Sequence, residues 1–226
     1  MHIEPGLVDG AKIVLSYATA AAAAGYTLKL AWSAIRENGL PSLVGRTLIT
    51  AALVFSFFEV LPHYPIGVSE VHFIFGSTLF LLFGAAPAAL GLAFGLLMQG
   101  LFLAPWDLPQ YGMNVTTLLV PLFAVAALAD RIIKPNTPYV DLAYGQALKL
   151  STTYQAGVVA WVAFWAIYGH GFEAENLSSV ARFGGAYLMV ILVEPLADLA
   201  VLFVAKTMHG VTDTSLFTKR LHNAAA

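Results

Sequence analysis

Seven apolar runs, each close to the length of a membrane-crossing helix, dominate this sequence. About 20 apolar residues in a helix cross the hydrocarbon core of a bilayer. Bounded by Pro, Gly or charged residues, the runs lie near 12–33, 45–61, 70–84, 86–104, 114–133, 150–169 and 182–205. The sequence lacks the short alternating segments of a membrane barrel, so we expect an all-α integral membrane protein, a bundle of about seven transmembrane helices.

The composition supports a membrane protein and excludes several functions. Of 226 residues, 59% are apolar and only 11% are charged, whereas soluble domains average about 25% charged residues. A formal net charge of −2, without a Lys/Arg cluster, leaves no surface for nucleic acid. Because the chain has no cysteine, disulfides and thiolate metal sites are excluded. Any bound metal must therefore be held by nitrogen or oxygen.

The distribution of Lys and Arg predicts the orientation in the membrane. Seven spans place the termini on opposite sides, and nine basic residues fall on one side: Lys29, Arg36, Arg46, Arg131, Lys134, Lys149, Lys206, Lys219 and Arg220. Lys12 and Arg182 fall on the other. Because basic residues concentrate on the cytoplasmic side, we expect a cytoplasmic C-terminus and an outward-facing N-terminus. The first residues carry no basic region, so we expect no cleaved signal peptide.

These features predict one polytopic membrane domain over 1–210, with a short N-terminal arm at 1–10 and a cytoplasmic tail at 211–226. The run at 70–84 is short and follows the turn-rich segment 62–67. Irregular backbone at membrane depth is tolerated only where it lines a cavity or packs within protein. We therefore expect the region around these segments to be irregular and buried.

Four of the six histidines fall at or near the outer side: His2, His63, His72 and His170. A terminal Met1-His2 can chelate a metal through the free amine, the His2 amide nitrogen and the His2 imidazole. Such planar nitrogen ligation suits copper or nickel, and low-spin cobalt could also occupy it. Histidine at position two also occurs by chance, and loop histidines often act as polar anchors. We favour His72 as a fourth ligand because an unpaired imidazole opening an apolar span is costly.

Several motifs together resemble the CbiM/NikM family, the substrate-binding membrane component of energy-coupling-factor (ECF) transporters for cobalt and nickel. The N-terminus Met1-His2-Ile3-Glu4-Pro5-Gly6 matches the family's opening residues. His72 is followed by a turn that resembles the family's Phe-Gly-Pro, and further matches are Gln99 in an apolar run and Tyr111-Gly112-Met113-Asn114. The resemblance covers most of the chain.

The resemblance implies a metal held by Met1, His2 and His72, with Gln99 and Asn114 orienting the ligating arm through hydrogen bonds. Glu194 matches a family glutamate in the last span, and His63, Glu70 and Glu194 are possible auxiliary groups. The implied fold is a six-helix ECF substrate-component core plus an extra N-terminal helix. Co²⁺ or Ni²⁺ would be the transported substrate, with no intrinsic cofactor and no enzyme activity.

The same resemblance implies partners and a location. The chain has no Gly-x-x-x-x-Gly-Lys-Ser/Thr motif to cradle nucleotide phosphates. We therefore expect a separate transmembrane coupling subunit, cytoplasmic ATPase subunits and a small accessory membrane subunit, all in the prokaryotic inner (plasma) membrane. The sequence departs from the family pattern at 105–110 and at Glu70 with 73–75, which leaves the choice of metal and any auxiliary ligand open.

Two other classes of function stay open at this point. An ion-coupled secondary transporter would use the intramembrane carboxylates Glu59, Glu194 and Asp198. A haem protein would need imidazoles on facing helices, but the histidines here lie at span ends.

Overall fold

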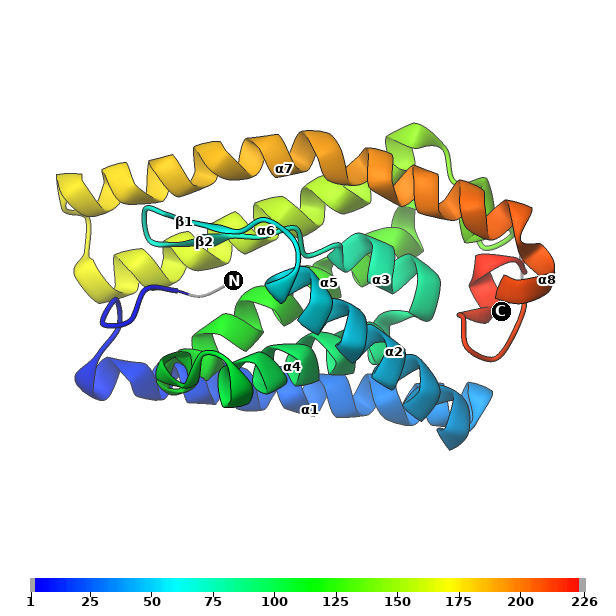
Figure 1. Ribbon diagram of the computed structural model, residues 1–226, viewed down its shortest axis with the longest axis horizontal. Helices are drawn as coiled ribbons and strands as arrows, with labels where there is room; N and C mark the ends of the chain where they lie inside the picture. The colour runs from blue at the N-terminus through cyan, green and yellow to red at the C-terminus, as the bar shows by residue number, and fades with distance from the viewer. Residues whose placement is uncertain (1–2, 224–226) are drawn as a thin grey trace.

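The computed structural model describes residues 3–223, which form an elongated helical bundle (Figure 1). Within these residues, six helices are long and apolar enough to cross a membrane. They are α1 (Ile13–Asn38), α2 (Leu40–Glu59), α4 (Ala85–Phe102), α5 (Tyr111–Ile132), α6 (Tyr144–His170) and α7 (Ala174–Thr207). The prediction of an all-α membrane bundle is confirmed, and each of these helices covers an apolar run of the sequence.

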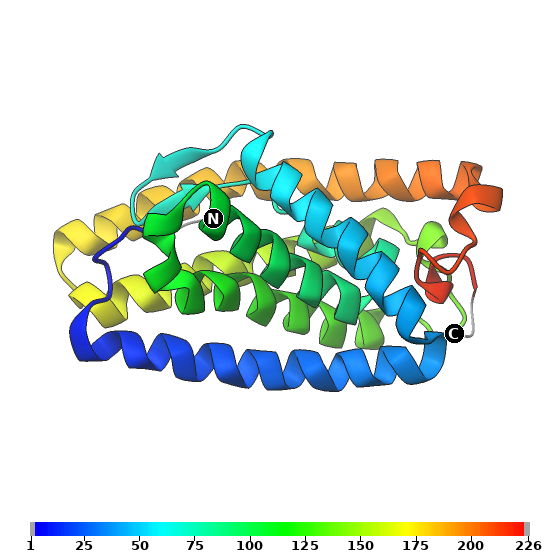
Figure 2. The same cartoon turned by 60° about the horizontal axis from the view of Figure 1, so that its bottom comes forward.

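Some long helices pack against their neighbours in the chain, and others pack against helices further along it. Helix α2 packs along α4, α5 contacts α1, α4 and α6, and α6 packs along α7. Helix α1 runs along one edge of the bundle (Figure 2). Short 3₁₀ segments precede, join or follow the helices: Gly10–Lys12, Pro105–Gln110, Tyr139–Asp141 and Lys219–Leu221. Helix α1 ends at Asn38 and is followed by Gly39, whose φ of 80° is a conformation that favours glycine.

The segment at 70–84 differs from the expected continuous span. Strands β1 (Tyr64–Ile66) and β2 (Ser69–Val71) form an antiparallel hairpin, and helix α3 covers only Gly76–Phe83. These eight helical residues rise about 12 Å, less than half of a bilayer's hydrocarbon thickness. Phe75, just before α3, adopts a left-handed conformation with φ of 54°. This crossing is therefore half extended backbone and half helix.

Two buried carboxylates of α7 stabilise the start of α3. Oε1 of Glu194 accepts hydrogen bonds from the amides of Ile74 and Phe75, at 3.2 and 3.1 Å. Asp198, one turn further along α7, accepts from the hydroxyls of Ser77 and Thr78. The first amides of a helix lack partners within the helix, and its N-terminus favours negative charge. The carboxylates therefore satisfy the polar groups that the break in the third crossing creates.

We expect Glu194→Ala to lower the thermal stability of the purified protein. Its loss leaves the buried amide of Ile74 and the partly buried amide of Phe75 without an acceptor. A fully buried donor without a partner costs about 1–3 kcal/mol. Glu194→Gln, which retains one acceptor oxygen, should be milder. The matched control is Glu175→Ala, because Glu175 is exposed near the start of the same helix. Equal melting temperatures for Glu194→Ala and Glu175→Ala in detergent would contradict this role.

The C-terminal segment folds back on one end of the bundle. This segment follows the short helix α8 (His209–Thr212). Its Ser215 carbonyl accepts a hydrogen bond from the Ser42 hydroxyl at 2.7 Å, and its Thr218 amide donates to the Leu82 carbonyl at 2.8 Å. The Phe217 ring stacks on Phe83 with 5.5 Å between centroids, and Leu221 is fully buried. The described part of the expected tail thus packs against the α1–α2 and α3–α4 turns.

The two ends of the bundle carry the loops expected on opposite sides of the membrane. At the end opposite the C-terminal segment, the Lys12 ammonium donates to the Gly169 carbonyl at 2.9 Å, and the Tyr17 hydroxyl donates to the Pro109 carbonyl at 3.0 Å. The turn between α6 and α7 also lies there, as both views show (Figures 1 and 2).

Which end faces outward stays a prediction from the Lys/Arg distribution. We expect the loops at 62–68 and 171–180 to be accessible from outside, and those at 36–44 and 135–147 to be cytoplasmic. Because the native chain has no cysteine, Phe172→Cys and Asn136→Cys introduce single exposed thiols at opposite ends. A membrane-impermeant maleimide should label only Phe172→Cys in intact cells. Labelling of Asn136→Cys alone would reverse the orientation.

Candidate metal site

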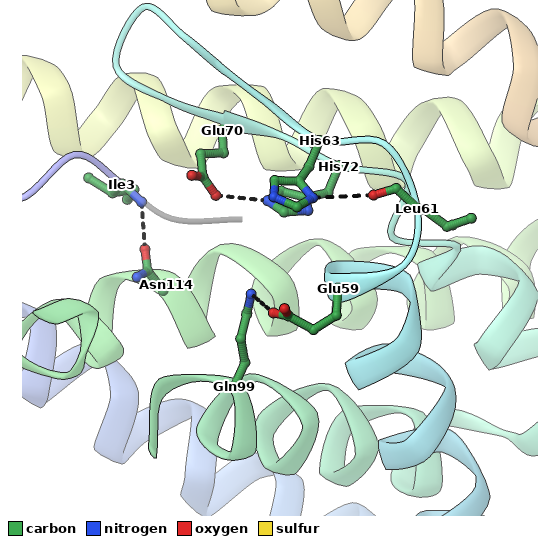
Figure 3. Close-up of polar contacts among 8 residues, drawn as sticks. All are labelled: Ile3, Glu59, Leu61, His63, Glu70, His72, Gln99 and Asn114. Atoms are coloured by element: carbon green, nitrogen blue, oxygen red, sulfur yellow. Dashed lines mark hydrogen bonds and ion pairs between the residues drawn. The ribbon is translucent and has the colours of Figure 1, made fainter. Parts of the chain in front are cut away.

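The N-terminal arm is fixed in the bundle by backbone contacts. Ile3 is fully buried, forms a β-bridge with Ser69, and donates its amide to Oδ1 of Asn114 at 2.9 Å (Figure 3). The Glu4 amide donates to the Val68 carbonyl at 3.2 Å. The arm thus extends the β1–β2 hairpin by a short antiparallel pairing. The predicted ligands Met1 and His2 lie outside the described residues.

Glycine at one position of α6 permits the arm to pack closely. A Cβ at Gly169 would lie 1.8 Å from the Leu7 carbonyl oxygen, a distance no side chain allows. Val8, the next residue of the arm, is buried at 1% exposure. The α6 surface therefore accommodates the arm between its anchor at Ile3 and the start of α1.

His72 lies deep in the bundle, directly after β2. Its side chain is 1% exposed, and its Nε2 lies 3.0 Å from Oε2 of Glu70 (Figure 3). The Phe58 ring contacts it edge-on, with 5.1 Å between centroids. His63, the residue before β1, stacks on His72 with 5.0 Å between ring centroids. The structure therefore brings His72, His63 and Glu70 together.

The other predicted histidine lies apart from this group. His170 is exposed at the end of α6, where its Nε2 is 3.5 Å from the Gly6 carbonyl oxygen. His63 is also exposed, and its Nδ1 lies 3.2 Å from the Leu61 carbonyl oxygen. A ring nitrogen facing a carbonyl must carry the proton, so that nitrogen of His63 is a donor in this arrangement.

The two predicted orienting amides have specific partners. Asn114, at 1% exposure, accepts from Ile3, as described above. Gln99 donates from Nε2 to Oε1 of Glu59 at 2.6 Å, joining α4 to the end of α2 (Figure 3). The pairing of Gln99 with Glu59 is not evident from the sequence, because the two residues lie on different helices, 40 positions apart.

Glu194 is engaged elsewhere. Besides the amides before α3, it accepts a hydrogen bond from Gln155 of α6, and it is fully buried. Within residues 3–223, no three His, Asp or Glu side chains converge in a group that could hold a metal ion.

These features define a polytopic membrane protein with a buried histidine, paired with a partly exposed carboxylate, beside an anchored N-terminal arm. Its fold resembles two crystal structures. One is of a transition metal transporter, with a TM-score of 0.69 and 17% identity over 93% of this chain and 94% of the other. The second is of a truncated transition metal transporter, with a TM-score of 0.67 and 18% identity over 92% and 99% of the two chains.

A family model described as the cobalt uptake substrate-specific transmembrane region, CbiM, matches residues 2–210. The chain belongs to this family. No curated protein sequence matched it. It is therefore a substrate-specific membrane component of metal uptake, and the expected resemblance to this family is confirmed.

Proposed function

We propose that this protein binds Co²⁺ or Ni²⁺ at the outer face and imports it as the substrate-binding component of an ATP-driven ECF transporter. The observation that carries the proposal is the anchoring of Ile3 to Asn114, in the same part of the bundle as buried His72. The arm is thereby fixed immediately after the two residues whose nitrogens would form the chelate. Membership of the cobalt-uptake family supports the choice of substrate.

The proposed ligand set is the Met1 amine, the His2 amide nitrogen and imidazole, and the His72 imidazole. Two fused chelate rings and one further imidazole complete a plane of four nitrogens, an arrangement suited to Ni²⁺ and accessible to low-spin Co²⁺. Because the metal must displace the amide proton, binding releases protons and weakens in acid.

The contacts of His72 with Glu70 give its imidazole a defined role. If Nε2 donates its proton to the Glu70 carboxylate, the lone pair for the metal is on Nδ1. Carboxylate partners of this kind fix the tautomer and orientation of a ligating histidine and raise its basicity. Glu59 and Glu70 also add negative charge near the site, which favours arrival of a cation.

ATP-driven import by this chain would need ATPases from other subunits, because its sequence has no phosphate-binding Gly-x-x-x-x-Gly-Lys-Ser/Thr motif. We propose a transmembrane coupling subunit, cytoplasmic ATPases and a small accessory membrane subunit as partners in the prokaryotic plasma membrane. Binding and reorientation then replace any covalent step.

Elemental analysis of protein purified with its native, untagged N-terminus tests the binding step. We expect close to one Co²⁺ or Ni²⁺ per chain after incubation with each metal. Uptake is then measured in vesicles with and without the ATPases. Uptake driven by a proton gradient alone, without ATPases, would instead support the ion-coupled transporter that uses Glu59, Glu194 and Asp198.

A further inference from the structure

A cavity of about 620 Å³ lies at the end of the bundle that carries the C-terminal segment. Helices α1, α4 and α5 form its walls, and residues 218–220 close it from the chain's end. Its volume is within the range of small-molecule sites, about 300–1,000 Å³. Leu30, Phe80 and Ala126 make part of the lining apolar, whereas the remainder is polar and charged. The cavity is thus amphiphilic.

Arg46, from α2, lines this cavity and is only 3% exposed. Its Nε donates to the Ser42 carbonyl at 3.3 Å and its Nη1 to the Phe83 carbonyl at 2.9 Å. Its Nη2 is buried and has no hydrogen-bond partner among residues 3–223. A buried guanidinium with an unmet donor and only neutral acceptors is costly. An anionic acceptor in the cavity would remove that cost.

The other charges of the lining leave a local excess of positive charge. Among the described lining residues, three are cationic and two are carboxylates. Asp130 is 3.6 Å from Arg220, and Glu37 accepts from the Ser33 hydroxyl at 2.9 Å. Lys219 donates to the Glu37 backbone carbonyl at 3.3 Å, so its ammonium lies at the cavity beside a neutral group. The lining thus has one net positive charge. Arg46 and Lys219 have no carboxylate within ion-pair distance among residues 3–223, although Glu37 also interacts with Arg46 electrostatically over a longer range.

We propose that this cavity binds a phosphate group, with Arg46 and Lys219 as its cationic partners. A guanidinium matches the geometry of phosphate oxygens and binds them with charge-assisted hydrogen bonds. The apolar part of the lining would accommodate the glycerol and upper acyl carbons of an anionic phospholipid. Basic pockets between transmembrane helices on the cytoplasmic side bind such headgroups. The same chemistry could be supplied by free phosphate.

The test compares thermal unfolding of the full-length protein in detergent with added phosphatidylglycerol, phosphatidylcholine or inorganic phosphate. We expect phosphatidylglycerol to raise the melting temperature and to remain bound in native mass spectrometry, while phosphatidylcholine does neither. Stabilisation by inorganic phosphate as well would assign the site to the phosphate group alone. No stabilisation by either anion would overturn the proposal.

Single substitutions test whether phosphatidylglycerol binds in this cavity. Lys219→Gln removes an exposed cation and should fold normally, whereas Arg46→Gln also removes the hydrogen bond to the end of α3. Each should weaken binding of phosphatidylglycerol about fivefold, the contribution of one basic residue near an anionic headgroup. The matched control is Lys149→Gln, because Lys149 is exposed near the start of α6 and outside the cavity. Equal binding by Lys219→Gln and Lys149→Gln would overturn the proposal.

Discussion

Adding one residue before Met1, with the rest of the chain unchanged, is expected to abolish high-affinity binding of nickel and cobalt. The extension converts the terminal amine into an amide, a poor metal donor, and moves the histidine to position three. Because Ile3 is held by Asn114 and Ser69, the arm cannot slide outward to absorb the added residue. Loss of partners that only orient a ligand costs about 10–100-fold in affinity, so loss of a ligand and its chelate ring should exceed that range.

Binding titrations with Ni²⁺ and Co²⁺ on wild type and the extended protein measure this effect. The matched control adds one residue after Ala226. It lengthens the chain by the same amount at the other end. Intact-protein mass spectrometry must show that the added N-terminal residue is retained, and thermal unfolding must show that the extended protein is folded. A folded, unprocessed extended protein that binds and transports like wild type would refute the chelate.

We expect His72→Ala to remove most metal binding, whereas His63→Ala and His170→Ala leave it largely intact. His72 is buried and held by Glu70, as a ligating imidazole needs to be. His63 and His170 are exposed, and their nearest ring-nitrogen partners are backbone carbonyls. The loss for His72→Ala should again exceed the range of about 10–100-fold that orienting groups supply.

The three variants are compared by metal titration at equal concentrations of folded protein. His63→Ala is the sharpest control because the His63 ring stacks directly on His72. It therefore reports any general disturbance of the cluster. If His63→Ala loses as much affinity as His72→Ala, the stacked pair would be the binding unit and His63 would have to be included among the ligands.

The sequence located the long helices because a bilayer imposes a one-dimensional requirement. A crossing helix needs a continuous apolar run, and such a run can be found without knowing its neighbours. The run at 70–84 met that requirement only in part. Its helix begins at Gly76, because Glu194 satisfies the amides before it. That partner lies 120 positions away in the sequence. The short run and the turn-rich segment before it therefore predicted irregular backbone in this region, but not where the helix begins.

For the candidate site too, the sequence predicted the residue types, whereas their contacts are known only from the structure. The Met1-His2 terminus, His72, Gln99 and Asn114 could be chosen from motifs, because the chemistry of a ligand depends on the kind of residue. The sequence could not predict that Gln99 pairs with Glu59, or that His72 contacts Glu70 and His63. Each depends on how close two side chains come once helices and hairpin have packed.

By itself, the sequence determined that this protein is a helical membrane protein of a metal-uptake family, and which nitrogens could form a chelate. Only the tertiary structure decided that the arm is anchored at Ile3, that α3 is half a crossing, and that Arg46 is buried with an unmet donor. The physical reason is that apolar length is a property of one segment. Satisfying polar groups in a medium without water is a property of several segments at once, and it is settled only when they meet.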